Sequence, residues 1–275
     1  MSFTFQPGMM YRMPVVFGPA MGPRQGPDGR KFDCIDNPKT TTVAVSFRSN
    51  LEQLAELLPE CFELDGEPIV TVAASYMTEI EWLAGRDYNI LGVTIPAVFR
   101  GDRDTARGPF LTVLWENLAD PIITGREELG FAKIYCELPD AEISSDRVRC
   151  TAGWLGFEFM EMKLTNLTEK SDSTENAASP VDGKLHYKYF PRTGEWGTSD
   201  VCHAVMTPAE TPNRKVVEQF SAEGAIKWNR ATWEDLPTLC PIVNGLAELE
   251  VIEFTSASLV RTIGGKDLSD QRILR

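Results

Sequence analysis

The sequence predicts an α+β protein dominated by strands, in which an antiparallel sheet forms a cone-like β-barrel with a few short helices. Most segments with a clear pattern alternate apolar and polar residues, which is typical of half-buried strands. Only two segments have the spacing of an amphipathic helix. The strands do not alternate with helices as they do in parallel βαβ units, so the pattern favours an antiparallel sheet closed on itself.

The first strand is predicted over residues 41–47, where Val43, Val45 and Phe47 alternate with small or polar residues. In the strand at 131–138, Lys133 is expected to share a face with Phe131. The strands expected from patterns of this kind are 41–47, 68–77, 108–116, 131–138, 148–164, 185–190, 201–206, 224–228 and 248–262.

Two short helices complete the prediction. The first starts after a cap at Ser49 or Asn50, has an apolar face that includes Leu54, and ends at Pro59. The second is expected over residues 231–239.

The chain is expected to divide into an arm and one domain. Residues 1–40 are rich in Pro, Gly and Met and have little periodicity, so we expect an extended N-terminal arm that packs on the body or on a neighbouring subunit. Residues 41–275 are expected to form a single β-rich barrel domain. The polar stretch near 165–183 is predicted to be a solvated loop between strands, because neither flank makes a complete core alone.

Composition excludes several classes of function. A net charge of −13 argues against a nucleic-acid partner, since binding to phosphates needs clustered Lys and Arg. No run of 18 apolar residues is present, so no membrane span is predicted. The N-terminus does not have the pattern of a signal peptide, and the six cysteines contain no Cys-x-x-Cys pair. These features favour a cytoplasmic protein with reduced thiols.

Neither a metal site nor several common catalytic motifs are predicted. The only histidines, His186 and His203, lie on predicted strands and form no metal-ligand pattern with Cys, Asp or Glu, so a structural role is favoured. No glycine-rich phosphate loop opens a helix, and no Gly-x-Ser-x-Gly sequence supports serine hydrolysis.

One lysine stands out because it lies in an apolar segment. Lys133 follows Gly125-Arg126-Glu127 and is flanked by Phe131 and Ile134. Burial lowers the pKa of a lysine, because it disfavours the charged form, and a neutral amine attacks carbonyls to form a Schiff base. The alternative is that Lys133 points outward on its strand and is solvated.

The sequence around Lys133 resembles the acetoacetate decarboxylase superfamily. That family has a Gly-Arg-Glu triplet at the same distance from its Schiff-base lysine as Gly125 is from Lys133. Weaker similarities cover most of the chain: Met13-Pro14, Phe17-Gly18-Pro19, Val45 to Asn50, Pro68-Ile69-Val70, and a C-terminal part with Leu236-Pro237 and residues 248–262. The resemblance implies a cone-like barrel with an interior cavity that holds the lysine, and assembly into a homo-oligomer.

The sequence departs from the family at several polar positions. A second lysine that follows the nucleophile in the decarboxylases is replaced by Ile134. The two acidic positions fall on Ala73 and Ile90, and the family's arginine falls near Thr40. We therefore expect a divergent member with a more apolar pocket and a reaction altered from acetoacetate decarboxylation.

The resemblance implies roles for the residues near Lys133. Lys133 is expected to form the Schiff base, and Tyr88, Glu116 or Glu127 to transfer protons. Arg126 and Glu127 either line the pocket or fix the turn before Lys133, and Phe131 is expected to help to bury the amine. No cofactor is needed, because the iminium is itself the electron sink.

Three functions remain open at this stage. The first is a carbon–carbon lyase that acts on a keto acid or ketone through Lys133. The second is an aldolase or dehydratase that uses the same lysine. The third is a non-covalent pocket that binds, isomerises or cyclises an apolar secondary metabolite.

Overall fold

The computed structural model describes residues 2–170 and 181–275. Its strands are β1 (Lys39–Arg48), β2 (Phe62–Leu64), β3 (Ile69–Ile80), β4 (Arg86–Arg100), β5 (Thr105–Glu116), β6 (Lys133–Tyr135), β7 (Glu142–Ile143), β8 (Arg147–Trp154), β9 (Phe157–Glu169), β10 (Gly183–Pro191), β11 (Ser199–Pro208), β12 (Lys215–Trp228), β13 (Glu253–Ile263) and β14 (Arg272–Ile273). The helices are α1 (Leu51–Ala55), α2 (Ala119–Thr124), a π-helical turn (Gly125–Leu129) and α3 (Cys240–Ala247).

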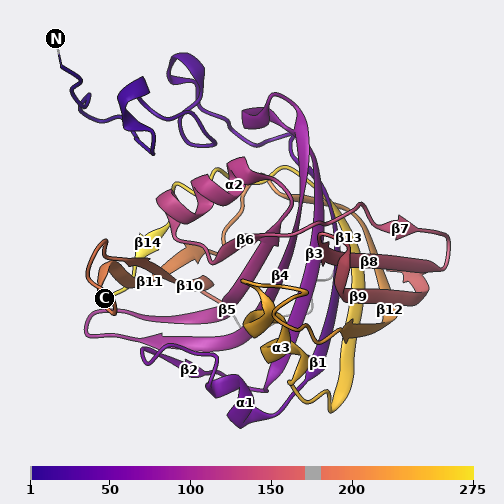
Figure 1. The fold of residues 1–275 in the computed structure, drawn as a ribbon. Coiled ribbons are helices and arrows are strands. Elements are labelled where there is room, and N and C mark those ends of the chain that lie inside the picture. Colours follow the sequence, from indigo (N-terminus) through magenta and orange to yellow (C-terminus); the bar gives the residue numbers. More distant parts are fainter. Residues whose placement is uncertain (1, 171–180) are drawn as a thin grey trace.

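The strands of the described residues join in one large, strongly curved sheet (Figure 1). Its order is β14-β11-β10-β5-β4-β3-β1-β13-β12-β9-β8-β7, with β2 paired to β4 and β6 paired to β5. Neighbours are antiparallel except for β10 and β6, which both run parallel to β5. The predicted strand-dominated fold with few helices is therefore confirmed. The sheet remains open between β14 and β7, and residues before and within α3 pack into its core instead.

Several element predictions were wrong in their bounds. The single strand expected at 148–164 is two strands, β8 and β9, because Leu155 and Gly156 adopt positive φ angles of 46° and 89° and turn the chain back. The helix expected at 231–239 lies later, at α3, where Pro241 occupies the first helical turn. Strand β4 was missed, since Gly92 and Pro96 interrupt its pattern.

The cap predicted for the first helix is confirmed. Asn50 caps α1, because its side chain accepts hydrogen bonds from the backbone N–H of Glu52 at 2.9 Å and of Gln53 at 3.2 Å. The loop predicted near 165–183 starts later than expected, because Thr165–Glu169 continue β9 along β12. The rest of that stretch, 171–180, lies outside the described residues.

Residues 2–38, which include most of the predicted arm, contain no strand of the sheet. They form two short 3₁₀ turns, Val15–Phe17 and Pro27–Gly29, and β1 begins at Lys39. Figure 1 shows this segment above α2, with its N-terminal end extending away from the sheet. The division into an arm and one domain stays a prediction.

The apolar side chains of β5 belong to two separate clusters. Trp115 is fully buried in the main core inside the curve of the sheet, with Phe159 and Trp228 beside it. Leu111 and Leu114 belong to a smaller cluster with Leu129 and Phe131. Because neighbouring side chains on a strand point to opposite faces, this second cluster lies across β5 from the main core.

The main core should depend strongly on Phe159. Its ring is fully buried, lies 5.4 Å from that of Trp115, and stacks on Trp228 at 6.4 Å. We expect Phe159→Ala to lower the free energy of unfolding by about 3–5 kcal/mol, measured by urea denaturation. Trp196→Ala is the control, since Trp196 is 93% exposed and its loss should change stability by less than about 0.5 kcal/mol. Equal effects of the two changes would contradict this account of the core.

Candidate active site

A short helical segment leads into Lys133. The sequence reading placed a simple turn at Gly125-Arg126-Glu127, but α2 continues into the π-helical turn Gly125–Leu129. Gly130, with φ of 79°, ends this turn, and the chain then enters β6. Lys133 is the first residue of β6 and pairs with Leu114 of β5.

The glycine of this segment makes room for the lysine. A Cβ atom added at Gly125 would lie 2.6 Å from Lys133 Nζ and would also overlap the end of its aliphatic chain. The φ of Gly125 is −70°, so an alanine there would conflict with the Lys133 side chain and not with the backbone conformation. The lysine therefore lies directly against the helical backbone.

The Lys133 amine is buried and has two polar neighbours. Its Nζ lies 2.7 Å from Oε1 of Glu116 and donates a hydrogen bond of 3.0 Å to the Pro121 carbonyl. Burial lowers the pKa of Lys133, while the Glu116 carboxylate opposes this shift and the charge of Arg24 adds to it. Burial raises the pKa of Glu116, and Lys133 opposes that shift. Both pKa shifts disfavour the state in which Lys133 and Glu116 are charged at the same time.

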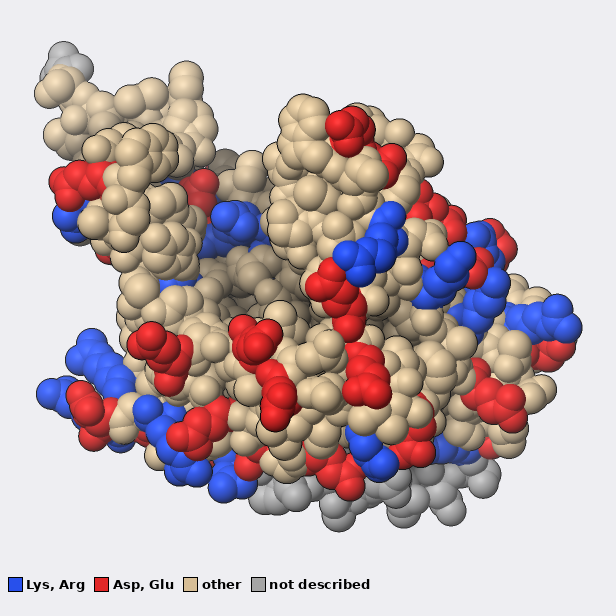
Figure 2. Space-filling model, turned by 60° about the horizontal axis from the view of Figure 1, so that its bottom comes forward, with Lys and Arg blue, Asp and Glu red and all other residues tan. Residues whose placement is uncertain are grey.

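These two residues lie in a cavity of about 270 Å³. Tyr88 and Phe131 also line it, as do apolar side chains of β3, β4 and β5 that include Met77, Ile90 and Leu111. Residues before β1, among them Pro23 and Phe32, contribute the remaining wall. Figure 2 shows the surface hollowed beside the N-terminal segment, with basic side chains visible in the hollow.

The structure brings together four of the predicted site residues. Lys133, Glu116, Tyr88 and Phe131 all line the cavity. Burial and the nearby Glu116 raise the pKa of the Tyr88 hydroxyl, so this hydroxyl keeps its proton.

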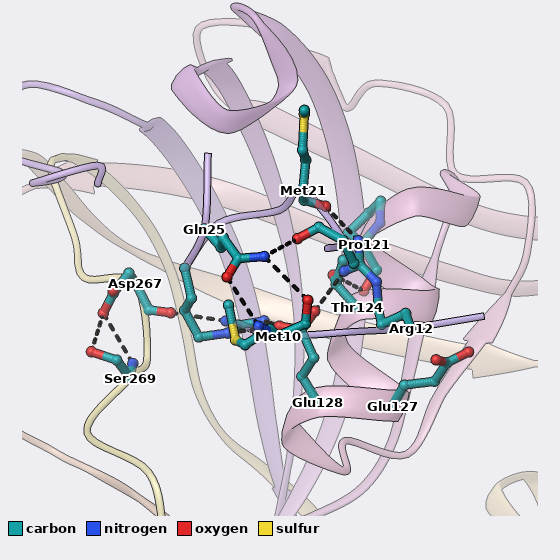
Figure 3. A network of polar contacts seen from close by, with 12 residues as sticks. Met10, Arg12, Met21, Gln25, Pro121, Thr124, Glu127, Glu128, Asp267 and Ser269 are labelled. Atoms are coloured by element: carbon teal, nitrogen blue, oxygen red, sulfur yellow. Dashed lines mark hydrogen bonds and ion pairs between the residues drawn. The ribbon is translucent and has the colours of Figure 1, made fainter. Parts of the chain in front are cut away.

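Arg126 and Glu127 are not part of this lining. Arg126 Nη1 donates to the backbone carbonyl of Lys133 at 2.7 Å, so it holds the start of β6. The backbone carbonyl of Glu127 accepts from Lys188 at 2.8 Å, and Figure 3 shows the Glu127 side chain pointing away from the polar network. Their positions fit the reading in which they fix the segment before the lysine.

The residues that replace the family's polar residues lie in different parts of the structure. Ile90 lines the cavity, whereas Thr40 lines a neighbouring pocket and Ala73 lines neither. Ile134 packs against the main core, on the opposite face from Lys133. A cation at position 134 would therefore not share the cavity with the amine.

Sequence reasoning missed three basic residues of the cavity: Arg24, Lys184 and Lys266. The cavity is thus less apolar than the losses at Thr40, Ala73 and Ile90 suggested. Arg24 lies in a segment without periodicity, and Lys184 lies on β10, far from the motif in sequence. A lysine that alternates with buried residues on a strand gives no signal of its own, because solvated lysines have the same pattern.

A pair of arginines fastens the N-terminal segment to the π-helical turn (Figure 3). Arg12 Nη1 lies 2.6 Å from Oε1 of Glu128, and Arg24 Nε donates to Oε2 of the same carboxylate at 2.9 Å. Arg24 Nη1 also donates to the Asp267 carbonyl at 2.9 Å. All three side chains are about nine-tenths buried. The wall of the cavity is thereby tied to the segment that positions Lys133.

His186 also contacts the segment that leads into Lys133. Its ring stacks on Phe131 at 4.3 Å, and Nε2 lies 3.0 Å from the Leu129 carbonyl oxygen. Burial lowers the pKa of His186 to about 4, so the ring is neutral and Nε2–H donates to this carbonyl near pH 7. Across the described residues no cluster of His, Cys, Asp or Glu has the arrangement of a metal site, and no helix there is long and apolar enough to cross a membrane.

Comparison with known proteins identifies the family. The acetoacetate decarboxylase family model matches residues 12–264, which is most of the chain. The chain belongs to the acetoacetate decarboxylase family. It is therefore an acetoacetate decarboxylase-like enzyme, as the sequence motif predicted. A search of curated proteins found no match.

Solved structures of acetoacetate decarboxylases and related enzymes share this fold at low identity. The acetoacetate decarboxylase of Legionella pneumophila subsp. pneumophila str. Philadelphia 1 has a TM-score of 0.62 at 16% identity, covering 90% of this chain and 92% of that one. An acetoacetate decarboxylase-like enzyme of Sphingomonas wittichii RW1 has 0.61 at 19%, covering 89% and 94%. The enduracididine biosynthesis enzyme MppR, complexed with pyruvate, has 0.60 at 15%, covering 92% and 98%. The low identities mark this chain as a divergent member.

The close contact at Gly125 gives a test of the site. We expect Gly125→Ala to displace the Lys133 amine from Glu116 and to lower the rate of reductive alkylation of Lys133 by a keto acid at least about tenfold, as a misplaced reactive group does. Intact mass after borohydride treatment measures this rate, and circular dichroism checks the fold. Gly245→Ala in α3 is the control, because a Cβ there meets no atom within 4 Å. Unchanged labelling of Gly125→Ala would contradict the geometry.

Proposed function

We propose that this protein is a carbon–carbon lyase in which Lys133 forms a Schiff base with a keto acid or ketone. The observation that supports this most directly is the buried Lys133 amine, held 2.7 Å from the Glu116 carboxylate in a cavity of the sheet. Amines activated by desolvation or by a neighbouring cation are an established means of covalent catalysis, for which acetoacetate decarboxylase is itself a standard example. Both influences act on Lys133, since burial and the Arg24 charge lower its pKa.

Glu116 and Tyr88 are proposed to move the protons. Glu116 accepts a proton from the Lys133 ammonium, and the neutral amine then attacks the substrate carbonyl to form a carbinolamine. Protonated Glu116 returns its proton to the carbinolamine hydroxyl, which leaves as water and gives the iminium. The raised pKa of Glu116 suits it to this acid and base role. Tyr88, whose hydroxyl stays protonated, is the proposed donor to the enamine carbon after carbon dioxide leaves.

The same iminium supports aldol condensation and dehydration as an alternative reaction. A specific observation favours this second candidate: MppR has been solved with pyruvate and with the condensation product of pyruvate and imidazole 4-carboxaldehyde. In that reaction the enamine derived from the keto acid attacks an aldehyde and no carbon dioxide is lost. Release of carbon dioxide from a keto acid, compared with consumption of an added aldehyde, distinguishes the two reactions.

A non-covalent pocket for an apolar secondary metabolite is supported less well. It would leave Lys133 with an ordinary pKa, whereas burial lowers the pKa of this amine. A cavity of about 270 Å³ suits a small acid better than a terpenoid or polyketide, since pockets for drug-sized ligands are roughly 300–1,000 Å³. We retain cytoplasmic location, homo-oligomeric assembly and independence from cofactors as parts of the proposal.

Trapping with borohydride tests the proposed Schiff base. Wild-type protein incubated with acetoacetate or pyruvate should gain the mass of one reduced adduct, and peptide mapping should place it on Lys133. Lys133→Met should lower this labelling at least about 100-fold, because the nucleophile is lost. Lys227→Met is the matched control, since Lys227 is exposed on β12. If no adduct forms in wild type while a known Schiff-base enzyme reacts in parallel, the covalent mechanism is wrong.

The pH dependence of trapping reports on Glu116. The carboxylate raises the pKa of Lys133 against the effect of burial, so Glu116→Gln removes this support and lowers the amine pKa further. The neutral amine then exists at lower pH, and the midpoint of the rising limb of the rate–pH profile should move down by at least about one unit. The maximum rate should fall as well, because proton transfer from Glu116 is lost. A midpoint that stays in place or moves up would exclude the proposed coupling.

A further inference from the structure

The basic residues of the cavity differ in whether their charge is already paired. Arg24 binds the Glu128 carboxylate through Nε and Nη2, and its Nη1 donates to the Asp267 carbonyl. Lys266 donates to the Pro208 carbonyl at 2.6 Å and lies 2.5 Å from Asp270. The charge of Arg24 is thus paired with Glu128, and that of Lys266 with Asp270.

Lys133 and Lys184 complete the set of cations. Lys133 is paired with Glu116 at 2.7 Å. The Lys184 backbone pairs with Thr207 of β11, but its side chain has no hydrogen bond or ion pair with any other residue in 2–170 or 181–275. Within the described part of the chain, it is therefore the cavity-lining cation whose charge is available to a ligand.

The sheet topology places Lys184 and Lys133 around the same cavity. Both β10 and β6 run parallel to the same strand, β5: Leu185 pairs with Phe110 and Lys133 pairs with Leu114. Four residue steps separate Phe110 from Leu114, roughly 13 Å along β5, and Lys184 lies one residue beyond Leu185 on the side away from Lys133. Leu185 is buried in the main core, so its neighbour Lys184 points to the opposite face, where the cavity lies. The two amines thus approach a ligand from two ends.

The two amines also interact electrostatically. Desolvation lowers the pKa of Lys184, and the charge of Lys133 lowers it further. Surrounding protein atoms account for this desolvation, yet Lys184 keeps accessible surface and lines the cavity, so an incoming anion can reach it. An anion bound there would relieve the repulsion between Lys184 and either the Lys133 ammonium or an iminium formed on it.

We propose that Lys184 binds the anionic group of the substrate and thereby selects small oxo acids over neutral ketones. This inference rests on the Schiff-base function proposed above and adds a specificity residue to it. Lys184 is a binding residue, and Lys133 remains the nucleophile. The carboxylate of the substrate lies at Lys184 while its carbonyl carbon meets Lys133.

Matched acids and esters test the proposal. Pyruvate and methyl pyruvate, and likewise 4-oxopentanoate and its methyl ester, have the same ketone and differ in charge. The concentration that gives half-maximal reduced adduct on Lys133 is measured for each compound in wild type, Lys184→Met and Lys184→Arg. Lys227→Met, which removes an exposed lysine of β12, is the control.

The expected result is a selective loss. Lys184→Met should raise the half-maximal concentration of the acids roughly 10- to 100-fold, as expected for a hydrogen bond between charged groups, and change that of the esters less than about threefold. Lys184→Arg should restore part of the preference, since it keeps the charge. Lys227→Met should behave as wild type.

Three results would overturn the proposal. The first is an unchanged preference for acids in a folded Lys184→Met protein. The second is an equal loss for acids and esters in both Lys184 variants, which would indicate a structural role. The third is an adduct that maps to Lys184, which would make it the nucleophile. Absence of any adduct in wild type would instead reject the Schiff-base function itself, so the two failures are distinguishable.

Discussion

The contact between the Lys133 amine and the Glu116 carboxylate is the interaction on which the site depends. Taking both charges out of water is unfavourable, and removing one partner would leave the other charge buried without compensation. The surrounding structure maintains this arrangement. Gly125 lets the lysine lie against the helical backbone, and the Pro121 carbonyl accepts a hydrogen bond from the amine. The result is a pair that is easily converted to its neutral form, which amine catalysis requires.

The clamp on Glu128 extends this dependence to the N-terminal segment. Arg12 and Arg24 neutralise a carboxylate that is itself part of the π-helical turn before the lysine, so the segment is fixed to the element that positions Lys133. Arg24 also contributes positive potential that disfavours the ammonium form of Lys133. One arginine therefore lines the wall of the cavity and helps to lower the pKa of the Lys133 amine.

The sequence was informative where function depends on neighbouring residues in the chain. The Gly125 to Lys133 spacing identified the family and the candidate lysine, and one of the two candidate caps, Asn50, does cap α1. It was less informative where distant segments converge. Arg24 and Lys184 come from a segment without periodicity and from a strand whose pairing partner cannot be read locally. The π-helical turn was also missed, because tertiary contacts of Glu128 and Arg126 stabilise it more than local propensity does.

The shortness of β6 has a consequence for how the chain tolerates length changes. Only three residues pair with β5, and they alternate: Lys133 enters the cavity, whereas Ile134 packs against the main core. A slip of one residue would place isoleucine in the cavity and drive an ammonium into a hydrocarbon core. Arg126 opposes such a slip by holding the Lys133 carbonyl. Single-residue insertions and deletions between Gly130 and Lys133 should therefore be more damaging than most substitutions there. The number of residues from Gly125 to Lys133 is set by the register of β6 as well as by the chemistry of the lysine.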